Sequence, residues 1–485
     1  MNCLSSSRWL EKIRRPFLLL ALGLMIPGIA TAQTQPVTVT VRDGGSGADL
    51  PSRFLGLSYE SSMLLPKDGR YYFNPDNQAL INTFHTLGIK SLRVGANAVD
   101  DPRVPIPQTN DIDMLFSFAR AAGVKVIYSF RLKNGDPADS ARLASYMAAH
   151  DGDALDSFAI GNEPSFYLPT FAAFFAQWKP NYDAILKAVP DAMFDGPSVA
   201  GKNIYAVDLA KAVSGEGHLA MASDHYYFLG SGREAEKDPP ATRVRFLSNN
   251  NDHNYEKAYA NIGAVLAAQG VPYRIDELNS CYNGGAKDAS DTYASTLWAL
   301  DCTHWWAAHH ILGMNYHTGE AVGRDGGFGA ANYAAFVHQP DGHGFNMRPQ
   351  AYAYLAFTQG AHGRPLGVEI QTDSAFNFNA YAYLDHDGST YLTLINKSYG
   401  EKALPAAVSL QLPPNTGAGT GQQMELTQGN QNITAKTDIT LGDAAIDAQG
   451  NWSGQWKQIE GSNANTLTVQ VAPASAIILH FSPAK

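Results

Sequence analysis

Apolar positions follow two different periods along the chain. Residues 37–42 alternate between apolar and polar side chains, which is typical of a half-buried β-strand. After a glycine-rich link, short apolar runs alternate with longer segments of helical periodicity, and this pattern predicts parallel βα units. The runs are 54–60, 91–97, 125–130, 157–163, 192–199, 219–227, 273–280 and 313–318. Eight such units over roughly 300 residues predict a (β/α)8 barrel, also called a TIM barrel.

The segments between these runs carry the marks of helices. Asp136 precedes a proline at the first helical position, and Thr170 has the side chain of an N-cap. An aromatic face at spacings i, i+3, i+4 and i+7 follows Thr170, which we interpret as core packing. It consists of Phe171, Phe174, Phe175 and Trp178. Later helices are expected at 255–269, 291–310 and 349–359.

From about residue 361 onwards the helical pattern gives way to β-like segments separated by Gly, Asn, Pro and Asp turns. They predict an antiparallel β-sandwich of roughly 120 residues. Strand 37–42 has no partner in the barrel, so we expect it to join the sandwich. The predicted organisation is an export signal at 1–32, a strand segment at 33–53, a catalytic barrel at 54–360 and a sandwich at 361–485.

The first 32 residues have the pattern of an export signal. Arg14 and Arg15 precede an apolar run, and Ala30-Thr31-Ala32 supplies small residues for cleavage. The run is short for a membrane span, and no later segment is apolar enough to span a bilayer. We therefore expect a protein exported to the periplasm or medium that has no membrane partner once the signal is removed. The choice between the general secretory and twin-arginine routes stays open.

Charge and cysteine content exclude some classes of function. The net charge is −10, and loss of residues 1–32 with four basic and one acidic side chain makes it −13. Nucleic acid is therefore not an expected partner. Beyond the signal only Cys281 and Cys302 remain, and the latter is expected mid-helix, about 18 Å from the helix start at 1.5 Å per residue. A disulfide requires Cα atoms within about 7 Å, so we predict two buried free thiols.

Two predicted barrel strands end in a glutamate. Residues 157–164 end in Gly161-Asn162-Glu163-Pro164, and residues 271–278 contain Asp276-Glu277. Pro164 stops the extended run, and the carboxyl ends of barrel strands are where catalytic groups gather. Glycosidic bonds are cleaved by one carboxyl group that protonates the leaving oxygen and another that acts at the anomeric carbon. The two glutamates are placed on strands four and seven of the predicted barrel. They therefore predict a glycosidase, and such an enzyme needs no metal or other cofactor.

This layout resembles the large clan of retaining glycosidases on the same barrel. By that resemblance Glu163 corresponds to the acid/base, Glu277 to the nucleophile and Asn162 to a donor to the sugar 2-hydroxyl. Further motifs resemble glycoside hydrolase family 79, which contains heparanase and microbial β-glucuronidases, and the pattern is most similar to exo-acting bacterial β-glucuronidases. They are Gly-Asn-Glu-Pro at 161–164, Asp-His-Tyr-Tyr at 224–227, and Glu277 followed by Cys-Tyr-Asn-Gly-Gly at 281–285.

The segment after Glu277 is a candidate site for a substrate carboxylate. Glycines allow close backbone approach, successive N–H groups can bind an anion, and Lys287 adds a positive charge. A helix expected to begin near Ser290 would point its N-terminus toward the same region. In family 79 glucuronidases the matching segment holds the substrate carboxylate, which by resemblance assigns that role to Tyr282, Gly284 and Lys287.

Other strand-end residues are weaker candidates for the site. Tyr226 or Tyr227 could hydrogen-bond the nucleophile or sugar, and Tyr226 is included among the predicted substrate contacts. His317 and Glu60 could bind sugar hydroxyls, and Arg93 could support the nucleophile electrostatically.

We thus expect a retaining hydrolase that removes terminal β-D-glucuronic acid from glycosides or glycosaminoglycan-type oligosaccharides. One alternative is an endo-acting, heparanase-like enzyme, whose cleft the segments 228–251 and 320–346 would shape as long loops. The other is a carbohydrate-binding protein without catalysis. Aglycone preference and oligomeric state stay open.

Overall fold

The structure is a computed structural model that describes residues 33–42, 47–320, 330–414, 416–417, 421–459 and 467–483. The predicted export signal at 1–32 lies outside these ranges. From Thr34 onwards the chain forms one compact unit. No helix within the described ranges is both long and apolar enough to cross a bilayer.

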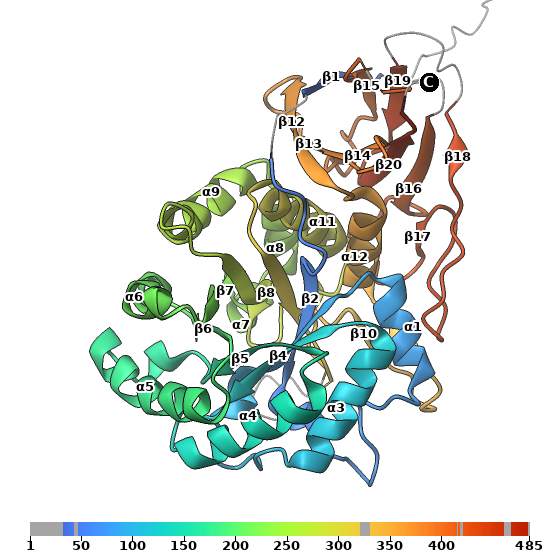
Figure 1. The fold of residues 1–485 in the computed structure, drawn as a ribbon. Coiled ribbons are helices and arrows are strands. Elements are labelled where there is room, and N and C mark those ends of the chain that lie inside the picture. The colour runs from blue at the N-terminus through green and yellow to red at the C-terminus, as the bar shows by residue number, and fades with distance from the viewer. Residues whose placement is uncertain are drawn as a thin grey trace, which may run out of the picture. The chain divides into compact units, whose positions relative to one another are not determined.

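Eight parallel strands close into a barrel in chain order, which confirms the predicted fold (Figure 1). Parallel strands covered by helices are buried on both faces, and every residue of β2, β3, β6 and β9 is buried. This explains why the sequence shows continuous apolar runs here. The strands are β2 (Leu55–Glu60), β3 (Ser91–Gly95), β4 (Lys125–Phe130), β5 (Leu155–Ile160), β6 (Phe194–Val199), β7 (Leu219–Ser231), β8 (Tyr273–Tyr282) and β9 (Gly313–His317).

Helices surround the barrel and begin at the caps that the sequence indicates. The Asp136 side chain accepts a hydrogen bond from Ala138 N–H, and Thr170 accepts one from Ala173 N–H. Phe174 and Trp178 are fully buried, as the aromatic face predicts. The α-helices are α1 (Gln78–Thr86), α2 (Ala96–Val99), α3 (Thr109–Ala122), α4 (Pro137–Asp151), α5 (Phe171–Ala188), α6 (Ile204–Val213), α7 (Gly232–Ala235), α8 (Pro239–Phe246), α9 (Asn251–Asn261), α10 (Gly263–Ala267), α11 (Tyr293–Ala308) and α12 (Pro349–Gly360). Short 3-10 turns are η1 (Ser61–Leu64), η2 (Pro164–Phe166) and η3 (Ser214–Glu216).

Two segments expected to be long loops contain regular structure. The first includes α7 and α8, and the second includes the antiparallel pair β10 (Phe336–His338) and β11 (Phe345–Met347). Residues 321–329 of the second segment lie outside the described ranges. Glycine-rich composition was therefore misleading there, because short elements of three to eight residues leave little periodicity to detect.

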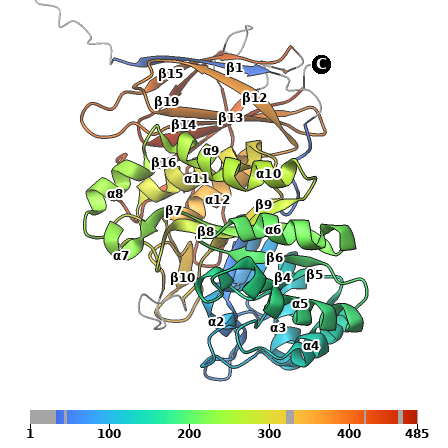
Figure 2. The same ribbon diagram turned by 90° about the vertical axis from the view of Figure 1, so that its left-hand side faces the viewer.

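The C-terminal strands form a separate, mainly antiparallel sheet domain with its own core (Figure 2). Its strands are β12 (Arg364–Gln371), β13 (Phe378–Leu384), β14 (Thr390–Asn396), β15 (Ala406–Gln411), β16 (Gln422–Gln428), β17 (Ile439–Leu441), β18 (Lys457–Gln458), β19 (Leu467–Val471) and β20 (Ser475–Phe481). The N-terminal strand β1 (Gln35–Arg42) joins it as predicted, between β12 and β15. It runs parallel to β15, so the sheet is mixed at this point.

The free state predicted for Cys281 and Cys302 is confirmed, and both are buried.

The domain boundaries proposed at residues 53 and 360 stay predictions. One apolar cluster includes barrel residues together with Tyr383, Ile395 and Ile478 of the sheet domain, so the two parts share a core.

A buried ion pair joins the barrel to the sheet domain. Lys397 Nζ lies 2.8 Å from a carboxylate oxygen of Asp301 on α11, and both side chains are at most 1% exposed. Asn379 and Tyr381 of β13 donate to the same carboxylate at 2.6 and 2.8 Å. These contacts fix helix α11 against β13 and against Lys397, the residue that follows β14.

The first prediction tests this ion pair. Lys397→Met leaves the Asp301 carboxylate buried without its cation and should cost about 3–5 kcal/mol of unfolding free energy. Adding Asp301→Asn should recover much of that loss, because the amide oxygen still accepts from Asn379 and Tyr381. Urea unfolding followed by tryptophan fluorescence measures both variants. The exposed Lys402→Met is the control, and an equal effect from this control would contradict the assignment.

Candidate active site

Strand β8 carries an irregularity at Glu277. Against β7, Ile275 pairs with Asp224 but Glu277 pairs with His225, so Asp276 is an extra residue in β8. The pairing of β8 with β9 shifts over the same residues. Such a bulge changes the direction of side chains. Here it turns two consecutive carboxylates, Asp276 and Glu277, toward the same side chains inside the barrel.

Glu163 lies just beyond the end of β5 in a left-handed backbone conformation, with φ +46°. Its N–H donates to Ser198 O at 2.8 Å, and the preceding Asn162 N–H donates to the buried Asp100 carboxylate at 3.0 Å. Tyr167 and two further backbone N–H groups also donate to Asp100. A strained residue persists only where its surroundings fix it, and these bonds hold the strand end in place.

Arg93 connects the end of β5 to the middle of β8. From β3 its guanidinium donates to Glu277 at 2.7 Å and to the Asn162 side chain at 2.7 Å, and it is fully buried. From the sequence we expect Arg93 to support Glu277 electrostatically, and the structure shows a direct contact between the two side chains. Tyr227 donates to the other Glu277 oxygen at 2.7 Å.

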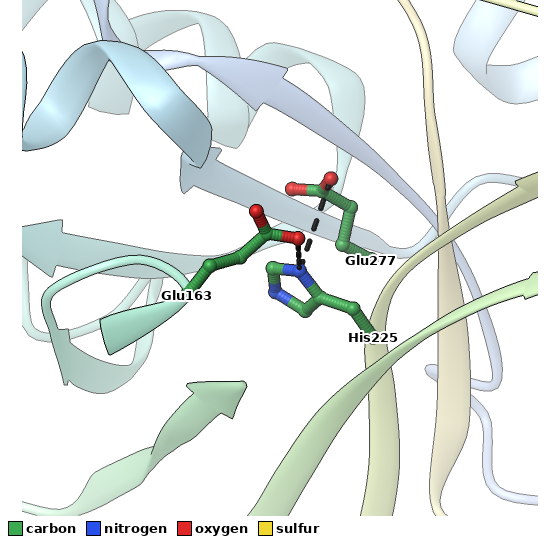
Figure 3. A group of neighbouring side chains, drawn as sticks. All are labelled: Glu163, His225 and Glu277. Atoms are coloured by element: carbon green, nitrogen blue, oxygen red, sulfur yellow. Dashed lines mark hydrogen bonds and ion pairs between the residues drawn. The ribbon is translucent and has the colours of Figure 1, made fainter. Parts of the chain in front are cut away.

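His225 lies between the two glutamates (Figure 3). Its Nδ1 is 2.9 Å from Glu163 Oε1 and 3.9 Å from Glu277 Oε1. One oxygen of each glutamate and a ring nitrogen of His225 all lie within 4.8 Å of one another. Both predicted catalytic glutamates are thus brought together. Glu163 is the more accessible, with its side chain 16% exposed against 4% for Glu277.

The two glutamates have different electrostatic environments. Burial by itself raises the pKa of Glu277, but the charges of His317, His225 and Arg93 and the bond from Tyr227 lower it more strongly. Glu277 is therefore an anion at neutral pH. Burial lowers the pKa of His225, whereas the Glu277 charge, the Glu163 bond and Asp276 raise it, to about 9 overall. His225 is thus a cation near neutral pH.

Tyr226 does not lie with these groups. Its ring packs against Trp306 of α11 at 5.6 Å, among the apolar side chains outside the barrel. Alternate residues of a strand point to opposite faces, so His225 and Tyr227 face the interior and Tyr226 faces the helices. Tyr226 thus faces away from Glu277 and its predicted contact with substrate stays a prediction, while Tyr227 has the position at Glu277.

Glu60 and His317 lie next to each other at the ends of β2 and β9. Glu60 accepts a bond from Ala98 N–H at 2.7 Å, and its other oxygen is 3.7 Å from His317 Nε2. His317 Nδ1 is 4.0 Å from Glu277. Both are buried beside the nucleophile candidate, and their role toward a sugar stays a prediction.

The segment after β8 forms a tight turn. Asn283, Gly284 and Gly285 all have positive φ, between +60° and +79°. The Tyr282 ring is 45% exposed and lies edge-on against Tyr227, with ring centres 6.2 Å apart. Lys287 is exposed. The binding of a substrate carboxylate by the N–H groups of this turn stays a prediction.

The expected contribution of a helix N-terminus to this turn is wrong. Helix α11 begins at Tyr293, and its first N–H groups donate to carbonyls of the sheet domain. Tyr293 N–H donates to Ala435 O at 2.8 Å, and Ala294 N–H donates to Ile433 O at 3.0 Å. Because these donors are occupied, they cannot serve a substrate anion.

Glu163, His225 and Glu277 also have the donor types of a metal site. Two observations argue against a cation there. Glu277 already contacts the Arg93 guanidinium at 2.7 Å, and His225 is itself a cation near neutral pH. A metal ion requires a neutral imidazole and would meet the fixed Arg93 charge, so this group fits a metal poorly.

Sequence reasoning missed several members of this site. His225 belongs to the Asp-His-Tyr-Tyr motif at 224–227, but the sequence predicts no role for it. Residues two apart in a strand share a face, so the spacing of His225 and Tyr227 could have indicated that both side chains enter the site. The sequence does not indicate that Asp276 and Asp100 belong to the site. Asp276 enters it through a bulge, and Asp100 through hydrogen bonds between distant segments, and neither feature leaves a local sequence pattern.

No family model matches the sequence. A β-glucuronidase of Aspergillus niger (strain ATCC MYA-4892 / CBS 513.88 / FGSC A1513) is 23% identical over 458 residues, covering 76% of this chain and 83% of that protein. Solved structures share the fold. A 4-O-α-L-rhamnosyl-β-D-glucuronidase from Fusarium oxysporum 12S has a TM-score of 0.66 at 19% identity, covering 91% of this chain and 99% of that one.

The fold is also found with other sugar specificities. A GH51 arabinofuranosidase from Xanthomonas axonopodis pv. citri has a TM-score of 0.65 at 14% identity, covering 92% of this chain and all of that one. In sequence and fold, the chain therefore resembles the β-glucuronidases of glycoside hydrolase family 79, and these comparisons together with the site support a glycoside hydrolase.

Proposed function

We propose that the protein is an exo-acting β-glucuronidase that removes terminal β-D-glucuronic acid with retention of configuration. The observation that carries this proposal is the pairing of Glu163 with Glu277. Their nearest oxygens lie within 4.8 Å, which suits the carboxyl separation of about 5–5.5 Å in retaining enzymes and not the 6.5–9.5 Å of inverting ones.

The roles of the two glutamates follow from their surroundings. Glu277 is an anion held by Arg93 and Tyr227, so its free electron pair is available to attack the anomeric carbon. Glu163 is the more exposed and contacts His225, a proton carrier. In the first step the Glu277 oxygen bonds to the anomeric carbon, the glycosidic C–O bond breaks, and Glu163 gives its proton to the leaving oxygen.

The second step reverses these roles. Glu163 takes a proton from water, the water oxygen attacks the anomeric carbon, and Glu277 leaves as a carboxylate. Asn162 is fixed by Arg93 and Asn97, at 2.7 and 3.2 Å, and is proposed to bond the sugar 2-hydroxyl. Glu60 and His317 are proposed to bind other hydroxyls. No step of this mechanism requires a cofactor.

The sugar is proposed to be a uronic acid because of the turn at residues 282–287. Residues 283–285 form a tight turn with positive φ whose N–H groups are proposed to bind the substrate carboxylate, and Lys287 adds a positive charge nearby. The similarity to two proteins named as glucuronidases points to the same substrate class. Exo action and export of the protein are likewise part of the proposal.

The second prediction concerns stereochemistry. Hydrolysis of an aryl β-glucuronide should release the β anomer first, because two displacements at the same carbon restore its configuration. Proton NMR during the first minutes of the reaction measures the anomer. Initial release of the α anomer would exclude double displacement.

The third prediction separates the two glutamates. Glu277→Gln should abolish turnover of all glucuronides, since no covalent intermediate can form. Glu163→Ala should slow substrates with poor leaving groups by about 10²–10⁴-fold, while a dinitrophenyl leaving group departs without protonation. Azide should partly rescue Glu163→Ala and give a β-glycosyl azide, which mass spectrometry and NMR identify. The same rescued anomer from Glu277→Ala would reverse the roles.

The fourth prediction tests the carboxylate site. The measured quantity is the ratio of kcat/KM for an aryl β-glucuronide to that for the matching β-glucoside. Gly284→Pro should strongly lower this ratio, because proline has no N–H donor and cannot adopt the positive φ of Gly284. Lys287→Ala should lower it less than about fivefold, as expected for an exposed charge.

The exposed Lys187→Ala on α5 is the matched control and should leave the ratio unchanged. A wild-type ratio near one would end the uronic acid assignment. The same assay with a heparan oligosaccharide distinguishes terminal from internal cleavage. Turnover of no glycoside at all would favour a binding protein without catalysis.

A further inference from the structure

His225 has two ring nitrogens, and the proposed mechanism uses one of them. Nδ1 faces Glu163 at 2.9 Å. Nε2 faces Asp276 Oδ1 at 3.7 Å, and neither atom has a hydrogen-bond partner among the described residues. Both side chains are fully buried, where an unpaired polar atom is costly. The two orphaned atoms are therefore each other's natural partners after a small side-chain adjustment or through one water molecule.

Asp276 is oriented for this contact by the bulge in β8. It is the extra residue of that strand, and its side chain meets Ser198, Arg93 and His225 inside the barrel. Its second oxygen accepts a hydrogen bond from Ser198 Oγ at 2.5 Å and lies 3.8 Å from Arg93 Nε. One oxygen is thus held by Ser198 and Arg93, which leaves the other free to face His225.

We propose that Asp276 is a positioning residue that fixes His225 with Nε2–H toward Asp276 and Nδ1 toward Glu163, so that His225 stores the proton that Glu163 exchanges with substrate. A buried carboxylate behind a histidine selects the ring tautomer and stabilises the imidazolium in the same way in serine hydrolases. This inference rests on the proposed double displacement and adds a residue that the displacement itself does not require.

Over one catalytic cycle the proposed proton transfer between His225 and Glu163 neither gains nor loses a proton. When Glu163 gives its proton to the leaving oxygen, His225 Nδ1–H can pass its own proton to Glu163, and neutral His225 keeps Nε2–H on Asp276. Before water attacks the intermediate, Glu163 returns this proton to Nδ1 and is a carboxylate again, and it then accepts the proton of the attacking water. Throughout the cycle the Nε2–H of His225 stays directed at Asp276. Esterification of Glu277 removes one anion from the site, so Asp276 becomes the remaining counter-ion of Arg93.

Other charged groups surround this pair on every neighbouring strand. Burial and the Asp276 charge raise the pKa of Asp195 on β6 well above its usual range. Burial likewise raises the pKa of Asp224 on β7, to about 7. The groups that face His225 or Asp276 are Arg93, Glu163, Asp195, Asp224, Tyr273, Arg274, Glu277 and, across Glu277, Tyr227 and His317. Asp276 is the carboxylate in this set that contacts Nε2.

The test compares Asp276→Asn with wild type on two aryl β-glucuronides, one with a dinitrophenol and one with a phenol leaving group. We expect kcat/KM for the phenyl substrate to fall at least tenfold, since that step needs the stored proton. We expect kcat/KM for the dinitrophenyl substrate to change less than threefold, because that leaving group needs no acid. A pre-steady-state burst of dinitrophenol should grow as hydrolysis of the intermediate slows.

The pH profile supplies a readout that a merely structural role would not move. The basic limb of kcat/KM for the phenyl substrate should shift down by about one pH unit or more when the Asp276 charge is lost. Asp276→Glu restores the charge and should return that limb toward wild type. Asp151→Asn removes another buried carboxylate, on α4, and should leave both substrates and the profile unchanged.

A measurement independent of turnover is the ¹⁵N NMR spectrum of the His225 ring. Wild type should show Nε2 protonated both below and above the titration of Nδ1, and Asp276→Asn should not. If Asp276→Asn fails to fold, Ser198→Ala, which frees the other Asp276 oxygen, should give a smaller shift of the basic limb in the same direction. An equal loss on both substrates with an unmoved limb would overturn the inference. An inactive or inverting wild type would instead overturn the proposed function.

Discussion

The buried contact between Arg93 and Glu277 is the interaction on which the centre of the barrel depends. A guanidinium and a carboxylate that are 0% and 4% exposed are stable only as a pair, since either alone would be a buried unpaired charge. Arg93 also reaches Asn162 and approaches Asp276, so one cation from β3 fixes side chains of β5 and β8. Arg93 therefore holds Glu277 directly and holds Asn162, the neighbour of Glu163 in the chain.

The bulge in β8 provides the second constraint. A regular strand would alternate its side chains, and Asp276 and Glu277 would then face opposite sides. Inserting one residue lets both enter the interior, so the barrel gains a reactive carboxylate and a supporting carboxylate from adjacent positions. Their charges are balanced by Arg93, His225 and His317, which explains why so many ionisable groups can share a buried space.

The sheet domain contributes to the site through helix α11 and the turn before it. Carbonyls at residues 433 and 435 cap the helix, and Lys436 lies 2.6 and 2.7 Å from Asp288 and Asp291. The loop that follows Glu277 is thus held from both domains. Because the barrel and the sheet domain also share an apolar core, the second domain is a structural support of the candidate site.

The sequence alone determined the eight barrel strands, the sheet domain with its N-terminal strand, and the placement of Glu163 and Glu277 on two of the barrel strands, although Glu277 lies in the middle of β8 and not at its end. These features rest on local periodicity, on caps and on proline, which act within a few residues of each other. Only the tertiary structure decided that Tyr227 rather than Tyr226 meets Glu277, that His225 joins the two glutamates, and that Asp276 points inward. Those facts depend on strand register and on contacts between residues far apart in the chain, and neither leaves a mark in the local pattern of apolar and polar positions.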